Sequence, residues 1–397
     1  MRKDLQRVAL GAILILLMLV AVRLFMYPPS SSAAAWDEFI AGSVEALPAN
    51  TWVQIHSETR ADWRRQGHAG ATYDSRRGTI LVFGSDTHGL DWDNTVREFD
   101  PRTRQWTTHY PEAPPSSYRA DPQGRAIAGT DRLLPWAMHV YDSIVYDPSL
   151  DALVVTALPQ HNPIRRDIRE ATEHPTWIYS LAERQWHILE NSNEPSPVFF
   201  AAGSAYDPDR DVVAAYRSGM WELGPERDRW LRATGERHHN LHYTVEYDRR
   251  HRVFAVFGDR GLTNDVWIYA PGPTAGSEGR WKKRSPQGDY CPPGQHFPVA
   301  FSDRHGAFLL VVDDVIAARD GEGRERLEPT GSAVTCVYDH GANRYTRLPD
   351  ARLERLGMNY MMAYDHFHDV FLLVAGNRQP TVWALRLDRT ELGEPGV

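Results

Sequence analysis

Residues 68–84 read HAGATYDSRRGTILVFG, in which an apolar run ends at Tyr73-Asp74, a polar turn follows, and a second apolar run leads to Gly84. Two short apolar runs joined by such a turn are typical of a β-hairpin. The same signature, an aromatic residue followed by aspartate directly or after one residue, occurs at Tyr73-Asp74, Tyr146-Asp147, Tyr206-Asp207, Tyr247-Asp248, Phe301-Ser302-Asp303 and Tyr364-Asp365. A repeat of this kind predicts one array of similar units.

Two further segments complete each unit. After residues 68–84 comes an apolar segment ending in Phe99-Asp100 and then, beyond a turn, a segment that contains Trp106. The later units follow the same plan, so each unit is predicted to be a four-stranded antiparallel sheet. Because such a sheet has two apolar faces, we expect six of them to pack around an axis as an all-β, six-bladed β-propeller.

The ends of the array predict how the propeller closes. The sixth unit supplies three strands, the last ending near Leu387, and no fourth strand follows in the sequence. Residues 51–55, TWVQI, precede the first unit and read as a strand without a sheet of its own. We expect this strand to complete the last blade and so cover an exposed sheet edge. The propeller then spans residues 51–388, with residues 389–397 as a C-terminal tail.

One unit matches a known pattern. It runs from Phe257-Gly258-Asp259 through residues 264–269, NDVWIY, to Trp281. These residues resemble the glycine pair, the Asn-Asp-Val-Trp strand and the closing Trp of the kelch-repeat propellers, in the galactose oxidase and kelch-like superfamily. The glycine pair is degenerate or missing in every unit. The resemblance implies a propeller, but kelch propellers include enzymes, sugar-binding proteins and protein-docking modules.

The overall charge excludes one class of partner. The 397 residues include 44 Lys and Arg against 52 Asp and Glu, a formal net charge of -8. Such a chain would repel the phosphates of a nucleic acid. The two cysteines are Cys291, before the first strand of the fifth unit, and Cys336, in its third strand. A disulfide between them can form in an oxidising compartment.

The N-terminal segment predicts a membrane anchor. From Val8 to Tyr27 the chain is apolar apart from Arg23, and the uninterrupted apolar stretch ends at Val22. About 20 residues suffice for a helix to cross a bilayer. Arg23 and Tyr27 suit the membrane interface at the far end of the span. Residues 8–27 are therefore interpreted as a transmembrane helix in contact with lipid.

Basic residues predict the orientation of this anchor. Arg2, Lys3 and Arg7 precede the span, so residues 1–7 are expected in the cytoplasm and the propeller on the periplasmic or extracellular side. The alternative is a signal peptide cleaved after Ala33-Ala34-Ala35. That site lies far beyond the apolar stretch, which favours an uncleaved, single-pass anchor.

Residues 28–50 are predicted to form a linker with a short amphipathic helix. Apolar residues recur at helical spacing between residues 36 and 47, beginning with Trp36, Phe39 and Ile40. This apolar face can lie on the membrane, contact a partner protein, or pack against the propeller.

A candidate site is predicted at the mouth of the propeller channel, where each unit enters its first strand. The residues five positions before each repeated aromatic are His68, Tyr141, Ala201, His242, His296 and Asn359. Converging imidazoles could hold a metal ion with an open position or act as acids and bases. His139 lies near the same level. The alternative is that these polar groups line a water-filled channel.

Three long connections with charges of both signs are expected on one face, and we interpret their arginines as partner contacts. Structureless loops of this length usually bind a partner, cover a site or stay disordered. They are residues 111–134, residues 159–175 with Arg165 and Arg166, and residues 313–331 with Arg324 and Arg326.

Two functions follow as hypotheses. The favoured one is a membrane-anchored, extracytoplasmic interaction or scaffold subunit of a larger membrane protein complex. The alternative is a periplasmic kelch-type enzyme, or a protein that binds a carbohydrate, another small molecule or a metal at the His-rich mouth. The sequence contains no phosphate-binding Gly-rich loop and no Gly-x-Ser-x-Gly elbow, so an enzyme is the less favoured of the two.

Overall fold

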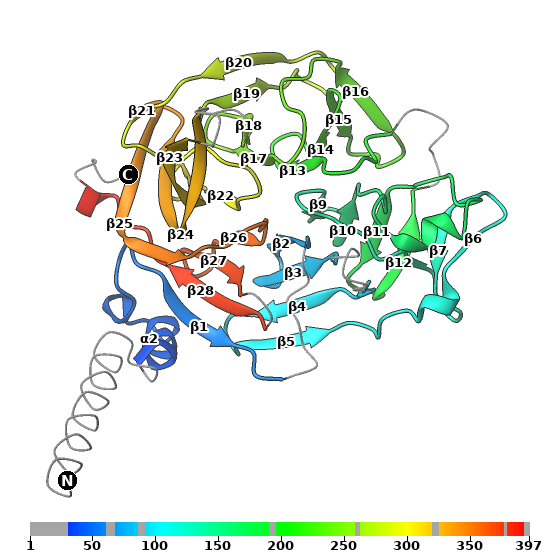
Figure 1. Cartoon of the computed structure of the whole chain (residues 1–397), viewed down its shortest axis with the longest axis horizontal. Coiled ribbons are helices and arrows are strands. Elements are labelled where there is room, and N and C mark those ends of the chain that lie inside the picture. The colour runs from blue at the N-terminus through cyan, green and yellow to red at the C-terminus, as the bar shows by residue number, and fades with distance from the viewer. Residues whose placement is uncertain are drawn as a thin grey trace, which may run out of the picture.

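The chain folds into antiparallel sheets arranged in a ring. The computed structural model describes residues 31–60, 68–85, 92–189, 196–258, 263–319, 325–376 and 379–392. These residues form six sheets of four or five strands and one small three-stranded sheet. Figure 1 shows the six larger sheets following one another around a centre. The fold is therefore all-β and β-propeller-like, as the repeat predicts.

The first three sheets run outward in chain order from their innermost strand. Their strands are β2 (Gly70–Asp74), β3 (Thr79–Phe83), β4 (Arg97–Asp100) and β5 (Gln105–Thr108); β9 (Ile144–Asp147), β10 (Ala152–Val155), β11 (Trp177–Ser180) and β12 (Gln185–Ile188); and β13 (Gly203–Asp207), β14 (Val212–Tyr216), β15 (Met220–Leu223) and β16 (Trp230–Thr234).

The next two sheets follow the same order, and the fifth gains an extra outer strand. They contain β17 (Thr244–Asp248), β18 (Val253–Phe257), β19 (Val266–Ala270) and β20 (Arg280–Arg284); and β22 (Val299–Ser302), β23 (Ala307–Arg319), β24 (Glu325–Asp339) and β25 (Arg344–Glu354), with β21 (Gln287–Gly288) pairing in parallel with β25.

The sixth sheet joins the two ends of the propeller. It contains β26 (Met362–Asp365), β27 (Val370–Ala375), β28 (Thr381–Leu385) and β1 (Val53–Ser57). β1 pairs antiparallel with β28, with Val53 opposite Ala384, and Figure 1 shows the two strands side by side. The N-terminal strand therefore completes the last blade, as predicted, two residues later in sequence than expected.

The six innermost strands form a closed ring of contacts. Each of β2, β9, β13, β17 and β22 contacts the next in this series, β22 contacts β26, and β26 contacts β2. Because strand direction alternates within each sheet, the turns between first and second strands and between third and fourth strands lie on one face. We call this the turn face. The remaining connections lie on the opposite face, called here the mouth face.

The repeated aspartates are turn-face caps. Five of the six, Asp74, Asp147, Asp207, Asp248 and Asp365, are fully buried; in the fifth blade Ser302 is buried instead and Asp303 is exposed. Asp74, for example, accepts hydrogen bonds on Oδ1 from the backbone N–H groups of Arg76 (2.9 Å) and Arg77 (3.0 Å). Its Oδ2 lies 2.8 Å from the Arg77 guanidinium. The aspartate thus satisfies the turn backbone and is itself neutralised, which explains why the fold repeats it.

The repeated tyrosines bind the same turns. In three blades the hydroxyl donates to an aspartate five residues later, with distances of 2.9 Å for Tyr146, 2.7 Å for Tyr206 and 2.6 Å for Tyr364. In the first blade this later position is Gly78, and the Tyr73 hydroxyl instead donates to Asp365 of the sixth blade. The signature therefore stabilises hairpins and, in places, links neighbouring blades.

The predicted amphipathic helix begins earlier than expected and packs on the propeller. It is α2 (Ser31–Ile40), followed by the short 3-10 helix η1 (Val44–Ala46). Gly42, with φ of 110°, ends the helix before residue 47. Trp36 is fully buried and donates from Nε1 to the Pro101 carbonyl (2.8 Å). Phe39 is also buried, so the chain's own propeller covers this apolar face.

This docking places α2 on the turn face. Asp37 forms an ion pair of 3.1 Å with Arg104. Pro101 and Arg104 both belong to the turn between β4 and β5. Figure 1 shows α2 beside β1, which it contacts.

The long connections are more ordered than expected. The connection at residues 111–134 contains η3 (Pro115–Ser117) and the small sheet of β6 (Arg119–Ala120), β7 (Ala126–Ala128) and β8 (Leu134–Pro135). The connection at residues 159–175 contains η4 (Pro163–Arg166). Outside these connections, η5 (Thr390–Leu392) lies in the C-terminal tail. The expectation of a structureless loop at 313–331 is wrong for its described residues. There β23 and β24 continue as a hairpin, with Val315 opposite Pro329 and Ala317 opposite Leu327. Apolar residues such as Val315 and Ile316 favour this extended pairing.

None of the helices within the described ranges is long and apolar enough to cross a membrane. The predicted anchor residues Val8, Val22, Arg23 and Tyr27 lie outside those ranges.

Candidate functional site

Five of the six predicted mouth positions share an unusual backbone conformation. The φ angles are 57° for His68, 52° for Tyr141, 55° for Ala201, 62° for His242 and 63° for His296. A positive φ is uncommon for residues other than glycine and often marks a strained functional position. The five positions are therefore structurally equivalent, and the residue at each can vary without changing the turn.

The sixth position, Asn359, serves the fold. Its side chain donates from Nδ2 to the Val374 carbonyl (2.9 Å) and accepts at Oδ1 from the Met361 N–H (2.7 Å). Both groups of the amide are used within the blade, and the residue is buried. The neighbouring Tyr360 takes its place at the mouth.

Two of the predicted histidines meet at Tyr360. The imidazole rings of His242 and His296 lie 4.1 Å apart between centroids. The Tyr360 hydroxyl lies 3.2 Å from Nδ1 of His296 and 3.5 Å from Nδ1 of His242. Burial raises the pKa of Tyr360 well above its ordinary value, so the hydroxyl stays protonated. It can donate to one imidazole and accept from the other.

The remaining mouth residues form a second group beside this one. The ring of His68 stacks on His139 with centroids 4.2 Å apart, and Nδ1 of His139 lies 2.9 Å from the Tyr141 hydroxyl. Tyr141 joins the two groups because its ring lies 5.1 Å from His242 and 5.4 Å from Tyr360. The mouth is thus one connected surface of aromatic and imidazole rings.

His161 and Phe200 extend this cluster of rings. Neither residue was predicted from the sequence, and Tyr360 was not predicted either. His161 packs on His139 at 5.1 Å and on Phe200 at 4.6 Å. Phe200 precedes Ala201 and Tyr360 follows Asn359, so widening the predicted positions by one residue would have found both. His161 lies in the loop at 159–175, where no repeat position identifies it.

Two half-buried carboxyl groups, those of Asp142 and Glu246, lie near the mouth and in the ring of innermost strands. Asp142 follows Tyr141 and accepts a hydrogen bond from the Val245 N–H (2.7 Å). Burial raises its pKa well above the ordinary value. Burial, with a smaller contribution from the charge of Asp303, also raises the pKa of Glu246 to about 8. Both carboxyl groups therefore keep their protons to a higher pH than ordinary carboxyl groups do.

The mouth histidines do not gather as a metal site of three. Among the described residues, one set of three His, Cys, Asp or Glu side chains has its ligand atoms within 4.8 Å of one another, namely Asp248, His251 and His340. These residues belong to the turn face. The half-buried imidazoles of His68, His242 and His296 instead offer hydrogen-bonding groups that suit a small polar ligand such as a sugar, beside the buried rings of His139, Tyr141 and Tyr360.

The charged mouth-face residues occupy ordered elements where the structure describes them. Arg165 and Arg166 are in η4. Arg326 is exposed on β24 and forms an ion pair with Glu328. Arg324 lies outside the described residues.

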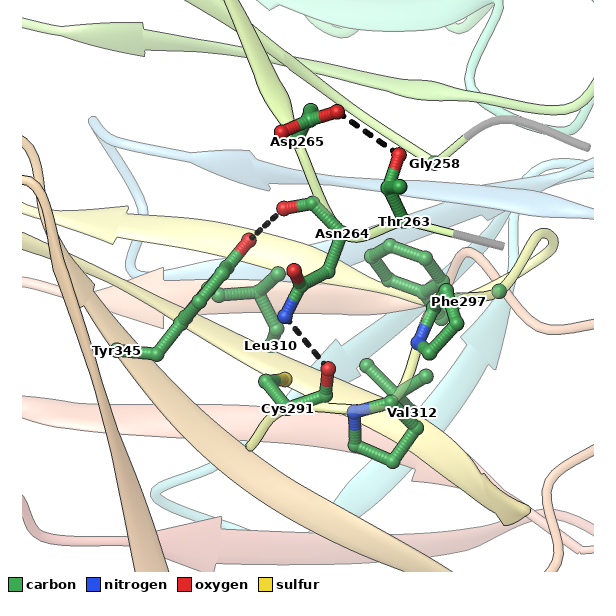
Figure 2. Close-up of a pocket in the computed structure, with 12 residues that line it drawn as sticks. Gly258, Thr263, Asn264, Asp265, Cys291, Phe297, Leu310, Val312 and Tyr345 are labelled. Atoms are coloured by element: carbon green, nitrogen blue, oxygen red, sulfur yellow. Dashed lines mark hydrogen bonds between the residues drawn. The ribbon is translucent and has the colours of Figure 1, made fainter. Parts of the chain in front are cut away.

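The two cysteines form a disulfide, with Cα atoms 6.1 Å apart. Figure 2 shows Cys291 in a pocket between the fourth and fifth blades, where Asn264 donates to the Cys291 carbonyl (2.6 Å) and the Tyr345 hydroxyl donates to the Asn264 carbonyl (3.3 Å). The pocket has room for about one water molecule. Asn264 therefore links neighbouring segments of the fold through these two hydrogen bonds.

Comparisons with known proteins assign no function. No protein-family model matches the chain, and no curated protein matches its sequence. Among solved structures, the chain is similar to a structural genomics protein of unknown function from Bacteroides thetaiotaomicron, with 10% identity and a TM-score of 0.42 over 85% of this chain and 73% of the other.

Proposed function

We propose that this protein is a membrane-anchored, six-bladed kelch-like propeller that serves as an extracytoplasmic interaction or scaffold subunit of a membrane complex. The observation that carries the proposal is the docking of α2 on the turn face. Its first residue, Ser31, lies four positions after Tyr27, the end of the predicted span. Four residues extend at most about 14 Å. The anchor would therefore hold the turn face close to the bilayer and direct the mouth face away from it.

The composition of the turn face supports this orientation. Phe367, in the turn between β26 and β27, is 56% exposed, and Val44 beside α2 is 50% exposed. Arg249, Arg252 and Arg304 also have largely exposed side chains in turns of this face. Exposed arginines beside apolar side chains suit the anionic headgroup region of a membrane.

The disulfide supports an extracytoplasmic location. Both cysteines of the chain are bonded to each other, and stable disulfides are typical of oxidising compartments. The mouth face then meets other extracytoplasmic proteins through its ordered projections. The largest of these is the hairpin of β23 and β24 beyond Val312, which carries Ile316 and Arg326.

Purification from gently solubilised native membranes tests this function. We expect the protein to co-purify with integral membrane proteins. Replacing residues 315–331 by an Asn-Gly turn should release them while leaving the melting temperature (Tm) within a few degrees, because the hairpin extends beyond the sheet. A matched control, Arg252→Ser with Arg304→Ser on the turn face, should keep the partners. Recovery of the unaltered protein as a free monomer would contradict the proposal.

A second candidate function is binding of a sugar or similar small ligand, with or without catalysis, at the mouth. The meeting of His242, His296 and Tyr360 favours it, because two imidazoles and a hydroxyl can exchange protons with a bound ligand. A glycan array with the unaltered protein and the His242→Ala, His296→Ala double variant tests it. Binding that is lost in the double variant supports this candidate, whereas no binding, or equal binding by both proteins, removes its basis.

A further inference from the structure

Asp248, one of the repeated aspartates of the turn face, has different partners from the other repeated aspartates. Asp147 and Asp207 pair with arginine guanidinium groups, and Asp365 pairs with one imidazole, that of His368 (2.6 Å). Asp248 instead meets two imidazoles at one carboxylate oxygen. Its Oδ2 lies 2.7 Å from Nδ1 of His251 and 2.9 Å from Nδ1 of His340.

The two imidazoles come from different blades. His251 is three residues after Asp248, in the turn between β17 and β18 of the fourth blade. His340 is in the turn between β24 and β25 of the fifth blade, and the two rings lie 4.6 Å apart. Asp248 is fully buried, His340 is mostly buried, and the side chain of His251 is 35% exposed. Solvent therefore reaches the cluster from the side of His251.

The charge of this cluster differs from that of its counterparts. An arginine carries a fixed positive charge, whereas a histidine is largely neutral at pH 7 unless its surroundings protonate it. Asp147 and Asp207 each meet such a fixed charge, whereas Asp248 meets two imidazoles at a single carboxylate oxygen. Two imidazole nitrogens and one carboxylate oxygen are also ligands that Zn²⁺ prefers.

We propose that Asp248, His251 and His340 bind a divalent metal ion of the zinc class, which cross-links the fourth and fifth blades on the turn face. The carboxylate and the two Nδ1 atoms are the protein ligands. The exposed side of His251 leaves a coordination position for water. The three ligand atoms lie within 4.8 Å of one another, and binding would bring each of them to about 2.0–2.1 Å from the ion.

The test is titration of metal-free protein with ZnCl2 by isothermal titration calorimetry. We expect one high-affinity equivalent per chain, together with a Zn²⁺-dependent rise in Tm. His340→Gln and His251→Gln should each weaken binding at least tenfold and remove the rise in Tm. The matched control is His368→Gln, which alters the equivalent aspartate-imidazole pair in the sixth blade and should bind like the unaltered protein.

Three results would overturn the site. Absence of saturable binding by the unaltered protein would mean that contacts with the two imidazoles alone hold Asp248. Equal loss of binding in His368→Gln would mean that the effect is not specific to the pair of imidazoles. Loss of binding in the His242→Ala, His296→Ala double variant but not in His340→Gln would place the metal at the mouth. Since two single variants report on the same ion, misfolding of one leaves the other to decide.

Discussion

The turn face and the mouth face of this propeller are built from equivalent positions but use them differently. On the turn face, five of the six repeated aspartates are buried, and each of these five has an arginine or imidazole partner, as Asp147 has in Arg227. On the mouth face, the equivalent positions hold unlike residues, such as His68, Tyr141 and His242, whose rings contact one another. Repetition therefore marks the residues that make the fold, and variation at a fixed backbone geometry marks the residues available for function.

The largest expected effect comes from breaking a turn-face ion pair. Arg227→Met leaves the fully buried Asp147 without its cation, because the Arg227 Nε lies 2.5 Å from Asp147 Oδ2. We expect the free energy of unfolding to fall by about 3–5 kcal/mol. Urea denaturation measures this value.

The matched mouth-face change is Arg326→Met, which breaks the exposed pair with Glu328. It should alter the free energy of unfolding by no more than about 0.5 kcal/mol. Similar losses in both variants would remove the distinction between the two faces.

An intermediate effect is expected between the faces, at Glu246 on β17. Its pKa is about 8 in the folded protein, against 4.5 for an unperturbed glutamate. Between these values the folded state binds more protons than the unfolded state, so stability falls as the pH rises. Glu246→Gln removes this loss. The variant's gain in free energy of unfolding over the unaltered protein should therefore be larger at pH 8 than at pH 5, by roughly 2 kcal/mol once solvent screening of the half-buried group is taken into account. Parallel Tm curves for both proteins across this pH range would show that Glu246 is ionised throughout.

A small effect is also expected at the mouth itself. His296 has a φ of 63° and Asp369 on the turn face has a φ of 56°, so glycine suits both positions equally. His296→Gly should change the free energy of unfolding by less than about 1 kcal/mol. Asp369→Gly should cost about 1–3 kcal/mol, because the Tyr364 hydroxyl (2.6 Å) and His305 (3.1 Å) lose their acceptor. Chemical denaturation of the pair measures the difference, and a larger loss in His296→Gly would make the mouth residue structural.

Most of the fold follows from the sequence because its signals are local and repeated. The aromatic-aspartate signature identifies each hairpin, and the missing strand after Leu387 predicts that the segment near Trp52 completes the last blade. The hairpin beyond Val312 was harder to predict, since its strands extend into a segment whose charges resemble those of a loop. The start of α2 was also missed, because Ser31 and Ser32 follow two prolines and resemble a linker.

The candidate site was predictable only in part. Counting from the repeat found the level of His68, His242 and His296, because position in a repeat fixes backbone geometry. It could not show which rings meet, since that depends on side-chain direction across blades, and it passed over Tyr360. Asp248 and His340 are 92 residues apart in the sequence. No local sequence pattern predicts a contact between residues so far apart.

The orientation of the two faces can be measured directly with the full chain in lipid nanodiscs that contain anionic lipid. Phe367 on the turn face and Ile316 on the mouth-face hairpin are 56% and 57% exposed, so Phe367→Cys and Ile316→Cys are a matched pair for a fluorescent label. With nitroxide-labelled lipid in the bilayer, the label at position 367 should be strongly quenched and the label at position 316 should not. Equal quenching, or stronger quenching at position 316, would contradict an orientation in which the mouth points away from the membrane.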